Sequence, residues 1–235
     1  NAACEPEVVQ LGMVLNKMGA KIKGLGSKKI IIEGVKKLKG INEIVPSDRI
    51  EAGTFAIAVS ATGGKIKLEN SNYDENKTLF RILEKTGSKI NKSKNSISIE
   101  KMNDEIFPVN IKTSPYPGFP TDLQAQIMTL MTISNGKSEI KENIFENRFM
   151  HVQELVRMGA NIKLDKDKAL IRGIKNLNGA NVMATDLRAS ASLIIAGLVA
   201  IGKTTISRIY HLDRGFYNLE CKLNNCGASI KRISE

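Results

Sequence analysis

Apolar and polar positions recur along this chain in a fixed order. Four amphipathic stretches each run into a Gly, followed by Ala or Ser and then by alternating apolar and polar residues: "LNKMGAKIKG", "LEKTGSKINK", "LVRMGANIKL" and "LNNCGASIKR". Gly commonly ends a helix in the left-handed conformation, and alternation with a period of two is typical of a strand. Each copy therefore predicts a helix, a glycine cap and a strand, with the caps at Gly19, Gly87, Gly159 and Gly227.

A second series of helices is interleaved with the first. Each begins at an acidic residue and is apolar on nearly every face: "PSDRIEAGTFAIAVSATGG", "PTDLQAQIMTLMTISNG" and "ATDLRASASLIIAGLVAIG". A helix without a polar stripe is predicted to be buried among other elements. Each of the three ends in a Gly-containing turn that leads into a predicted strand, and the leading acids are Asp48, Asp122 and Asp186.

The two series combine into one unit of helix, strand, helix, strand and often a further strand, which is a βαβαββ-type repeat. Three units fit between Pro46 and the C-terminus, whereas the first 45 residues hold the second half of a unit. We therefore expect an α/β fold of approximate threefold symmetry, with buried helices inside and sheets outside. Residues 1–46 are expected to be the remnant of one domain, and residues 47–235 to form a second. Because the chain opens within a repeat and without Met, we also expect a substantial N-terminal part to be missing.

Threefold symmetry would bring the N-termini of the three buried helices to one end of the fold. Helix N-termini carry unpaired N–H groups and partial positive charge, which favour a bound anion. Ser47, Thr121 and Thr185 precede the three leading acids and are the predicted N-caps. This end of the fold is therefore the predicted site.

Charged side chains gather at the same end. Asp122 is either an acid that complements the helix dipole or a carboxylate that handles a proton. Arg49 and Arg188 oppose the dipole at their helix N-termini, so each requires an anion, either a ligand or a neighbouring acid. Arg148 and Arg214 follow predicted strands in equivalent loops, and Arg can bind phosphate or carboxylate through two hydrogen bonds. The set favours a substrate with several negative charges.

Composition narrows the class of partner. The net charge is +11, from 35 Lys and Arg against 24 Asp and Glu, which raises the possibility of nucleic-acid binding. The lysines are scattered along the chain, aromatic residues make up 5% and Trp is absent, so base-stacking surfaces are not expected. We interpret the charge as a solvated basic surface that also suits a small polyanionic substrate. The longest apolar run, Leu193 to Ile201, is too short to span a membrane.

Other residues that carry chemistry form no known motif. Cys4, Cys221 and Cys226 lack metal-ligand spacing and are interpreted as free thiols of a cytoplasmic protein, although a catalytic thiol among them stays open. His151 and His211 lie near the arginine loops and are interpreted as packing or orienting residues. The chain contains no Walker loop, no GxGxxG after a strand and no HExxH, and we expect neither a cofactor nor a metal.

Four long motifs resemble the UDP-N-acetylglucosamine 1-carboxyvinyltransferase family: "FPTDLQAQ", "FENRFMHVQELVRMGA", "MATDLRASASLIIAGL" and "RIYHLDRGFYNLECKLNNCGASI". The resemblance implies a two-domain fold of inside-out α/β barrels, each built of three βαβαββ units. It also implies transfer of the enolpyruvyl group of phosphoenolpyruvate to the 3-hydroxyl of UDP-N-acetylglucosamine, with release of phosphate. This reaction is the first committed step of peptidoglycan synthesis, and so serves cell-wall formation, cell shape and cell division. The implied enzyme is cytoplasmic and monomeric, and uses no nucleic acid, membrane or cofactor.

The same resemblance implies roles for individual residues. Asp122 matches the acid that contacts the sugar 3-hydroxyl and is the proposed base. Arg188 and Arg214 match the arginines that clamp the phosphate and carboxylate of phosphoenolpyruvate. Arg148 matches another active-site arginine, and Asp186 matches an acid of the same cluster. Further matches are a backbone contact to the sugar nucleotide at Ile144 and polar residues near the cleft at Glu5, Asp48 and Arg49.

The chain departs from the family in what it lacks. The lysine–asparagine pair near the start of the family's chain is absent, and so is the mobile loop whose Cys or Asp donates a proton. None of the three cysteines occupies that loop position. The chain by itself is therefore expected to hold about half of an active site and to be inactive.

Three alternatives remain open. One is an enolpyruvyl transferase of the shikimate pathway, which resembles this family in fold and chemistry but is not expected to carry "ENRFMHVQEL" or "YHLDRG". Another is a basic nucleic-acid-binding module, which includes a relative of the RNA cyclases. The third is a non-catalytic remnant.

Overall fold

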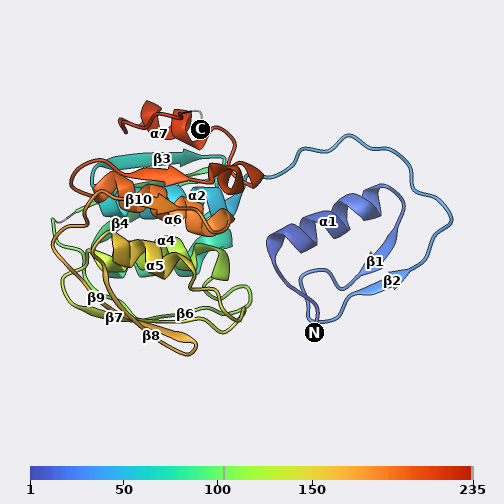
Figure 1. Cartoon of the computed structure of the whole chain (residues 1–235). Coiled ribbons are helices and arrows are strands. Elements are labelled where there is room, and N and C mark those ends of the chain that lie inside the picture. The colour runs from blue at the N-terminus through green and yellow to red at the C-terminus, as the bar shows by residue number, and fades with distance from the viewer. Residues whose placement is uncertain (103, 234–235) are drawn as a thin grey trace.

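The computed structural model describes residues 1–102 and 104–233 (Figure 1). A small N-terminal part stands beside the body of the molecule, and residues 34–48, which form no helix or strand, connect the two. In this part the antiparallel pair β1–β2 follows the helix α1, and Gly19 ends that helix with a φ of 106°. The elements are α1 (Pro6–Lys17), β1 (Lys21–Lys23) and β2 (Ile31–Glu33).

The body contains the three predicted units. The first consists of α2 (Arg49–Thr62), β3 (Lys65–Glu69), the 3-10 turn η1 (Tyr73–Asn76), α3 (Lys77–Lys85), β4 (Ser88–Lys92) and β5 (Ser96–Lys101). Its strands form an antiparallel sheet in the order β3-β5-β4. Strand order thus places the last strand of the unit between the other two.

The second unit is a full βαβαββ repeat. Its four-stranded sheet has the order β6-β7-β9-β8, in which β6 and β7 are parallel and the other pairs antiparallel. The parallel pair flanks the buried helix α4, as the repeat predicts. The elements are β6 (Ile111–Lys112), η2 (Thr121–Leu123), α4 (Gln124–Thr132), β7 (Lys137–Lys141), α5 (His151–Arg157), β8 (Asn161–Asp165) and β9 (Lys168–Arg172).

The third unit begins in the same way but ends differently. Its parallel strands β10 and β11 flank the buried helix α6, and a 3-10 turn and a short helix follow. The strand expected after Gly227 is not formed among the described residues, so that prediction was wrong. The elements are β10 (Asn181–Met183), α6 (Leu187–Val199), β11 (Thr205–Ser207), η3 (Ile209–Arg214) and α7 (Leu219–Asn225).

Among the described residues, no second strand pairs with the segment after Gly227. The Asn224 amide donates to the carbonyl of Ile230 and accepts from its N–H, both at 2.8 Å. Asn16 makes the same pair of bonds with Ile22, which lies in β1. The same side-chain bonds therefore form after Gly19 and after Gly227. A strand results only after Gly19, where β2 lies alongside and completes the pairing.

The glycine caps are present at all four predicted positions. Gly87, Gly159 and Gly227 have φ values of 104°, 96° and 98°, close to that of Gly19, and side chains other than Gly rarely adopt this conformation. The chain thus reverses after each amphipathic helix in the same way. Strands follow at three of the four positions, as β1, β4 and β8.

The three acid-led helices form the core of the body. Helices α2, α4 and α6 pack against one another, and every residue of α4 is buried. Polar side chains also form hydrogen bonds between these helices: the Gln126 amide donates to the Thr54 hydroxyl at 3.2 Å, and the Thr129 hydroxyl donates to the backbone carbonyl of Ser192 at 3.3 Å. With sheets around this centre, the predicted arrangement of helices inside and sheets outside is confirmed (Figure 1).

A glycine allows close approach in this core. A Cβ atom at Gly53 of α2 would lie 2.6 Å from Cδ1 of Leu123, so a larger residue would force the helix away from η2. Since η2 carries Asp122, this contact helps to set the distance between the start of α4 and the first half of α2. None of the helices in the described part of the chain is long and apolar enough to cross a membrane.

Candidate active site

Two of the three inner helices, α2 and α6, are capped by their leading acids. One carboxylate oxygen of Asp48 accepts from the N–H groups of Ile50 and Glu51, at 2.7 and 3.0 Å. Asp186 accepts in the same way from Arg188 and Ala189, at 2.8 and 2.9 Å. An ionised carboxylate satisfies two N–H groups and also complements the helix dipole.

The predicted N-caps were therefore wrong: at α2 and α6 the cap is the next residue, and the third helix start has no side-chain cap. Ser47 donates its hydroxyl to the carbonyl of Asn70 instead, at 2.5 Å. The hydroxyl of Thr185 lies 3.5 Å from a carboxylate oxygen of Asp186. Thr121 makes no capping bond, and its hydroxyl takes part in the charged cluster described below. Asp48 and Asp186, which were predicted as substrate-binding residues, thus use one oxygen each to start a helix.

Asp122 lies at the centre of a charged cluster. Its Oδ1 accepts from Nη2 of Arg148 at 2.7 Å, and its Oδ2 accepts from Nη2 of Arg188 at 2.7 Å. The three side chains come from η2, from the loop after β7 and from the first turn of α6. The structure therefore brings together three of the predicted site residues from two different units.

The two arginines determine the protonation of Asp122. Burial acts to raise the pKa of this carboxyl, but the charges and hydrogen bonds of Arg188 and Arg148 outweigh burial, so the pKa lies below its usual value. The Asp122 side chain is 35% exposed, more than those of Arg148 and Arg188, at 22% and 16%. Asp122 is therefore an ionised carboxylate that solvent and a ligand can reach.

Aromatic rings support both guanidinium groups. The centre of the Arg148 guanidinium lies 4.9 Å from the centroid of the Phe145 ring, and that of Arg188 lies 5.9 Å from the centroid of Phe216. The face of an aromatic ring attracts a cation and restrains its position. Phe145 and Phe216 were not among the predicted site residues, because a single sequence does not distinguish such a ring from an ordinary core residue.

A buried carboxylate that sequence reasoning missed lies behind the cluster. Glu142 is 3% exposed and accepts from the hydroxyls of Thr113 and Thr121, each at 2.8 Å. It also accepts from the N–H groups of Ile144 and Phe145, at 2.8 and 3.2 Å. In "SEIKENIFENR" it resembles the exposed acids around it, and the sole available signal was its place directly after a predicted strand.

Arg49 and Glu5 lie at the junction between the N-terminal part and the body. Arg49 forms a two-pronged ion pair with Glu7 of α1, at 2.7 and 3.2 Å, and its guanidinium lies 5.8 Å from the ring centroid of Tyr116. One carboxylate oxygen of Glu5 accepts from the N–H of Tyr116 at 3.4 Å, and the other is buried without a partner among the described residues. The anion that Arg49 was predicted to require is thus a neighbouring acid.

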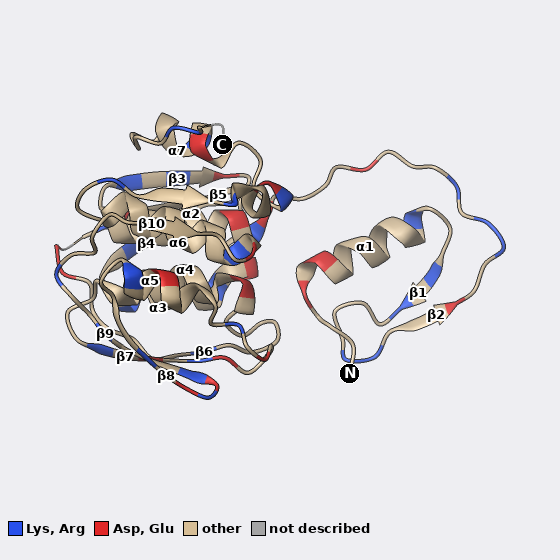
Figure 2. Cartoon of the chain, in the orientation of Figure 1, with Lys and Arg blue, Asp and Glu red and all other residues tan. Residues whose placement is uncertain are grey.

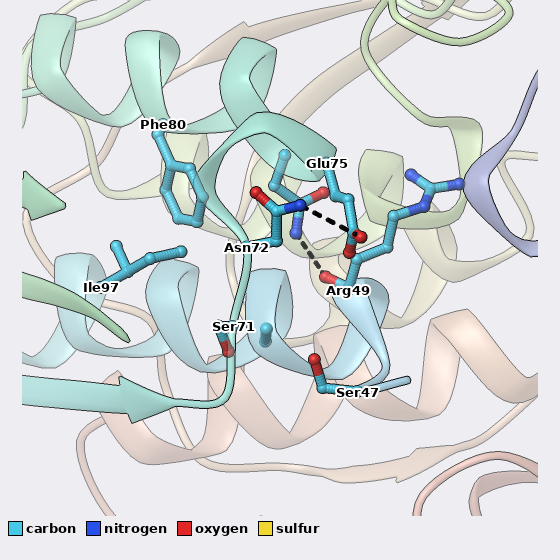
Figure 3. Close-up of a pocket in the computed structure, with 9 residues that line it drawn as sticks. Ser47, Arg49, Ser71, Asn72, Glu75, Phe80 and Ile97 are labelled. Carbon is cyan, nitrogen blue, oxygen red and sulfur yellow. Dashed lines mark hydrogen bonds between the residues drawn. The ribbon is translucent and has the colours of Figure 1, made fainter. Parts of the chain in front are cut away.

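A cleft of about 680 Å³ opens at this junction, lined among others by Cys4, Gln10, Lys28, Glu75 and Tyr116. A second hollow beside it contains Ser47, Arg49 and Asn72 (Figure 3), but it encloses about 0 Å³. Within that hollow the Asn72 amide donates to Glu75 at 3.4 Å. The first of the two is therefore the one with room for a ligand.

Arg214 lies at the end of η3 and is exposed. It forms no ion pair with any residue that the structure describes, so it is not part of the cluster around Asp122. A Cβ atom at the next residue, Gly215, would lie 2.8 Å from Leu187, which precedes Arg188 in α6. The loop that carries Arg214 is thus packed against the helix start that carries Arg188.

The two histidines differ in burial, since His151 is buried and His211 is half-buried. His151 is buried at the start of α5, and burial lowers its pKa to about 4, against the opposing effect of Asp186. Its ring is therefore neutral at physiological pH. The ring of His211 lies 4.3 Å from that of Tyr210. The three cysteines are free, and the described residues contain no group of three or more His, Cys, Asp or Glu side chains that could hold a metal ion.

Charge is concentrated where these side chains meet. Figure 2 shows acidic and basic segments side by side at the end of the inner helices that faces α1. The buried helix starts, the acid–arginine cluster and the junction with α1 all belong to this end of the body. A surface of fixed, opposite charges beside helix N-termini can bind and orient a small anionic molecule.

The family of EPSP synthase (3-phosphoshikimate 1-carboxyvinyltransferase) matches residues 1–223. The chain belongs to this family. Among its curated relatives, the UDP-N-acetylglucosamine 1-carboxyvinyltransferase of Afipia carboxidovorans is 55% identical over 234 residues, and that of Bartonella henselae is 57% identical over 236. These alignments cover 100% of this chain and 54% and 55% of the relatives, so the chain spans about half the length of the curated relatives it matches.

Solved structures share the fold. The enolpyruvyl transferase NikO from Streptomyces tendae matches with a TM-score of 0.85 and 25% identity, over 97% of this chain and 54% of that one. An EPSP synthase from Acinetobacter baumannii matches with a TM-score of 0.72 and 19% identity, over 95% of this chain and 55% of that one. The expected inside-out α/β barrel of βαβαββ repeats, and the resemblance that implied it, are confirmed.

Proposed function

We propose that the protein containing this chain transfers the enolpyruvyl group of phosphoenolpyruvate to the 3-hydroxyl of UDP-N-acetylglucosamine, with release of phosphate. The observation that carries the proposal is the Asp122 carboxylate held between Arg148 and Arg188. The names of the relatives at 54–57% identity support the choice of acceptor. The activity belongs to the longer protein, because this chain corresponds to about half of those relatives.

The arginines suit phosphoenolpyruvate, which carries a phosphate and a carboxylate. A guanidinium group has five N–H donors, and Arg188 uses one of them on Asp122. Its remaining donors, together with those of the exposed Arg214, are available to two anionic groups. Fixed cations around the reacting carbon also stabilise the charge of the tetrahedral intermediate, since they need no reorganisation during the reaction.

Asp122 is the group that takes the proton of the sugar hydroxyl. In the proposed addition, the hydroxyl oxygen bonds to C2 of phosphoenolpyruvate, its proton passes to Asp122, and C3 receives a proton from a group outside this chain. The bond from C2 to the phosphate oxygen then breaks, C3 loses a proton, and the double bond forms again. Binding of the anionic substrate to the arginines would weaken their hold on Asp122 and make it a stronger base.

The N-terminal part fits a second domain. We propose that residues 1–46 belong to a domain whose remainder lies in the other half of the protein. Leu11 and Ile32 are 59% and 69% exposed, and Ile44 is 89% exposed, so this part offers apolar side chains to a further structure. Closure of the two domains over the cleft at Tyr116 would exclude water from the reaction. The proposal includes a monomer in the cytoplasm that serves peptidoglycan synthesis.

A second acceptor has one observation in its favour. The matching family is described by the name of 3-phosphoshikimate 1-carboxyvinyltransferase, which uses shikimate 3-phosphate. This alternative predicts the same arginine–carboxylate cluster, because both reactions transfer the enolpyruvyl group of phosphoenolpyruvate by the same chemistry. The acceptor therefore separates the two candidate functions.

Release of inorganic phosphate by the full-length protein tests the proposal. We expect release with phosphoenolpyruvate and UDP-N-acetylglucosamine together, and none when shikimate 3-phosphate replaces the sugar nucleotide. Release with phosphoenolpyruvate and shikimate 3-phosphate, but not with phosphoenolpyruvate and UDP-N-acetylglucosamine, would support the second candidate. Release with neither acceptor, in a protein that is folded by circular dichroism, would refute both.

A further inference from the structure

We propose that Glu142 is a positioning residue, which holds the Arg148 guanidinium in place through the hydroxyl of Thr121 and through the backbone of the loop that carries Arg148. The inference rests on the proposed function, because it assigns a role within the same site. Glu142 itself does not touch Asp122 or either of its arginines.

A chain of hydrogen bonds connects Glu142 to Asp122. Thr121 donates its hydroxyl proton to Oε2 of Glu142 at 2.8 Å. The same hydroxyl oxygen accepts from Nη1 of Arg148 at 2.7 Å, and Nη2 of that arginine donates to Asp122 at 2.7 Å. The order is therefore carboxylate, hydroxyl, guanidinium, carboxylate, with both ends negatively charged.

The carboxylate determines the direction of the hydroxyl. A Thr hydroxyl can donate or accept, whereas an ionised Glu can only accept. Glu142 therefore requires the Thr121 proton to point toward it, and this leaves the lone pairs of the hydroxyl oxygen directed at Arg148. A guanidinium group has no acceptor, so this orientation is the one that lets Thr121 bind it.

Glu142 also organises the loop that carries Arg148. Its Oε1 accepts from the N–H groups of Ile144 and Phe145, which lie near the start of this loop. Phe145 in turn lies under the Arg148 guanidinium at 4.9 Å. Both routes from Glu142, by the hydroxyl and by the backbone, therefore end at the same guanidinium group.

Glu142 is a buried carboxylate that is held by hydrogen bonds alone. It is 3% exposed, and none of the ion pairs in the described part of the chain includes it. A buried charge without a cation is costly unless hydrogen bonds replace its water. Four donors supply them here, and three of the four belong to the residues that position Arg148.

Glu154 provides a matched control. It is also a buried carboxylate of the second unit, 7% exposed, and accepts from the N–H of Met183 at 3.1 Å. It forms an ion pair with Arg157 at 3.4 Å and has no bond to the cluster around Asp122. Loss of its charge disturbs packing and a backbone contact without disturbing Arg148.

The experiment compares Glu142→Gln and Glu154→Gln in the full-length protein. In Glu142→Gln, the amide oxygen can serve the three donors at Oε1, and the amide N–H then faces Thr121. The hydroxyl must turn its proton away and its contact with Arg148 weakens. We expect kcat to fall about 10- to 100-fold while binding of UDP-N-acetylglucosamine is retained, since small displacements of a positioned group act mainly on the transition state. Glu154→Gln is expected to lower the melting temperature without this loss of kcat.

Two variants of Thr121 test the route. Thr121→Ser keeps the hydroxyl and should retain activity, whereas Thr121→Val removes it and should lose activity to a similar extent as Glu142→Gln. If the carboxylate acts through this hydroxyl, the double variant Glu142→Gln/Thr121→Val should be no slower than the worse single variant. Multiplication of the two effects, or an unchanged kcat in Glu142→Gln, would overturn the inference.

A crystal structure of the Glu142→Gln protein shows the position of Arg148, which can be determined without any enzymatic activity. We expect Arg148 to have left Asp122 or Thr121, with at least one of the two contacts broken. An unchanged Arg148 would overturn the inference even in an active enzyme. If the wild-type protein releases no phosphate with any acceptor, the proposed function fails, and the position of Arg148 still decides the role of Glu142.

Discussion

The carboxylate of Asp122 lies 2.7 Å from Nη2 of Arg188, a residue 66 positions further along the chain. The two residues occupy the starts of two inner helices, and no local pattern connects them. Threefold packing of the repeats is therefore what turns two separate helix starts into one charged site. The predictions below address this site and the packing that creates it.

Asp122→Ala in the full-length protein should lower kcat by at least ~10²-fold, as expected for a group that handles a proton. The same change also leaves Arg148 and Arg188 without their shared anion. Steady-state phosphate release measures the effect. Asp165→Ala, at an exposed carboxylate that ends β8, is the control and should leave kcat unchanged. A rate close to that of the wild type would remove Asp122 from the mechanism.

Arg214→Ala should chiefly impair the use of phosphoenolpyruvate, because its exposed guanidinium is proposed to bind that substrate. We expect the KM for phosphoenolpyruvate to rise by a much larger factor than the KM for UDP-N-acetylglucosamine. Arg172→Ala removes an exposed arginine from β9 and serves as the control. A variant that is weakened only toward the sugar nucleotide would show that the assignment is wrong.

Acid should remove the stabilisation that Asp122 provides. Its pKa is lowered in the folded protein, because the two arginines outweigh the effect of burial. The stabilisation is therefore fully present above the ordinary carboxyl pKa of about 3.9 and is lost as pH falls through the lower folded value. We expect the difference in melting temperature between the wild type and Asp122→Asn to shrink below about pH 4. A difference that stays constant with pH would contradict the ion-paired arrangement.

His151 should act over a different range of pH. Burial lowers its pKa to about 4, so the folded protein resists protonation that the unfolded chain accepts below its ordinary value of 6.5. Stability should therefore fall as pH drops from about 6.5 to about 4, and should then stop changing on account of this group. His151→Gln should abolish this part of the pH dependence, as measured by thermal unfolding. His211→Gln, at a less buried site, is the control.

Gly53→Ala should destabilise the body by about 1–3 kcal/mol, because the new methyl group would overlap Leu123 in a closely packed core. Chemical denaturation measures this change. Gly34→Ala, where a Cβ atom meets nothing within 4 Å, should have little effect on stability. Equal stabilities of the two variants would show that α2 and η2 are not held at this distance by packing.

Much of this fold could be read from the sequence, because its signals are local. A Gly that closes a helix and an alternating run that follows it depend on a few neighbouring residues, and all four caps formed as predicted. The burial of the acid-led helices was also evident, since a helix that is apolar all round has no face to offer to water. The acids and arginines at the helix starts were recognised because their position beside an apolar helix is also a local signal.

Tertiary structure decided what depends on distant partners. The strand after Gly227 did not form, because no second strand among the described residues lies beside it, although Asn224 makes the same local bonds that Asn16 makes with β1. Thr121 was expected to cap a helix but instead bonds to Glu142 and Arg148, both of which approach it from beyond β7. Glu142 itself became visible only when the fold buried it among donors from separate segments. A hydrogen bond depends on atomic distance, and sequence position by itself does not determine the distance between side chains on different repeats.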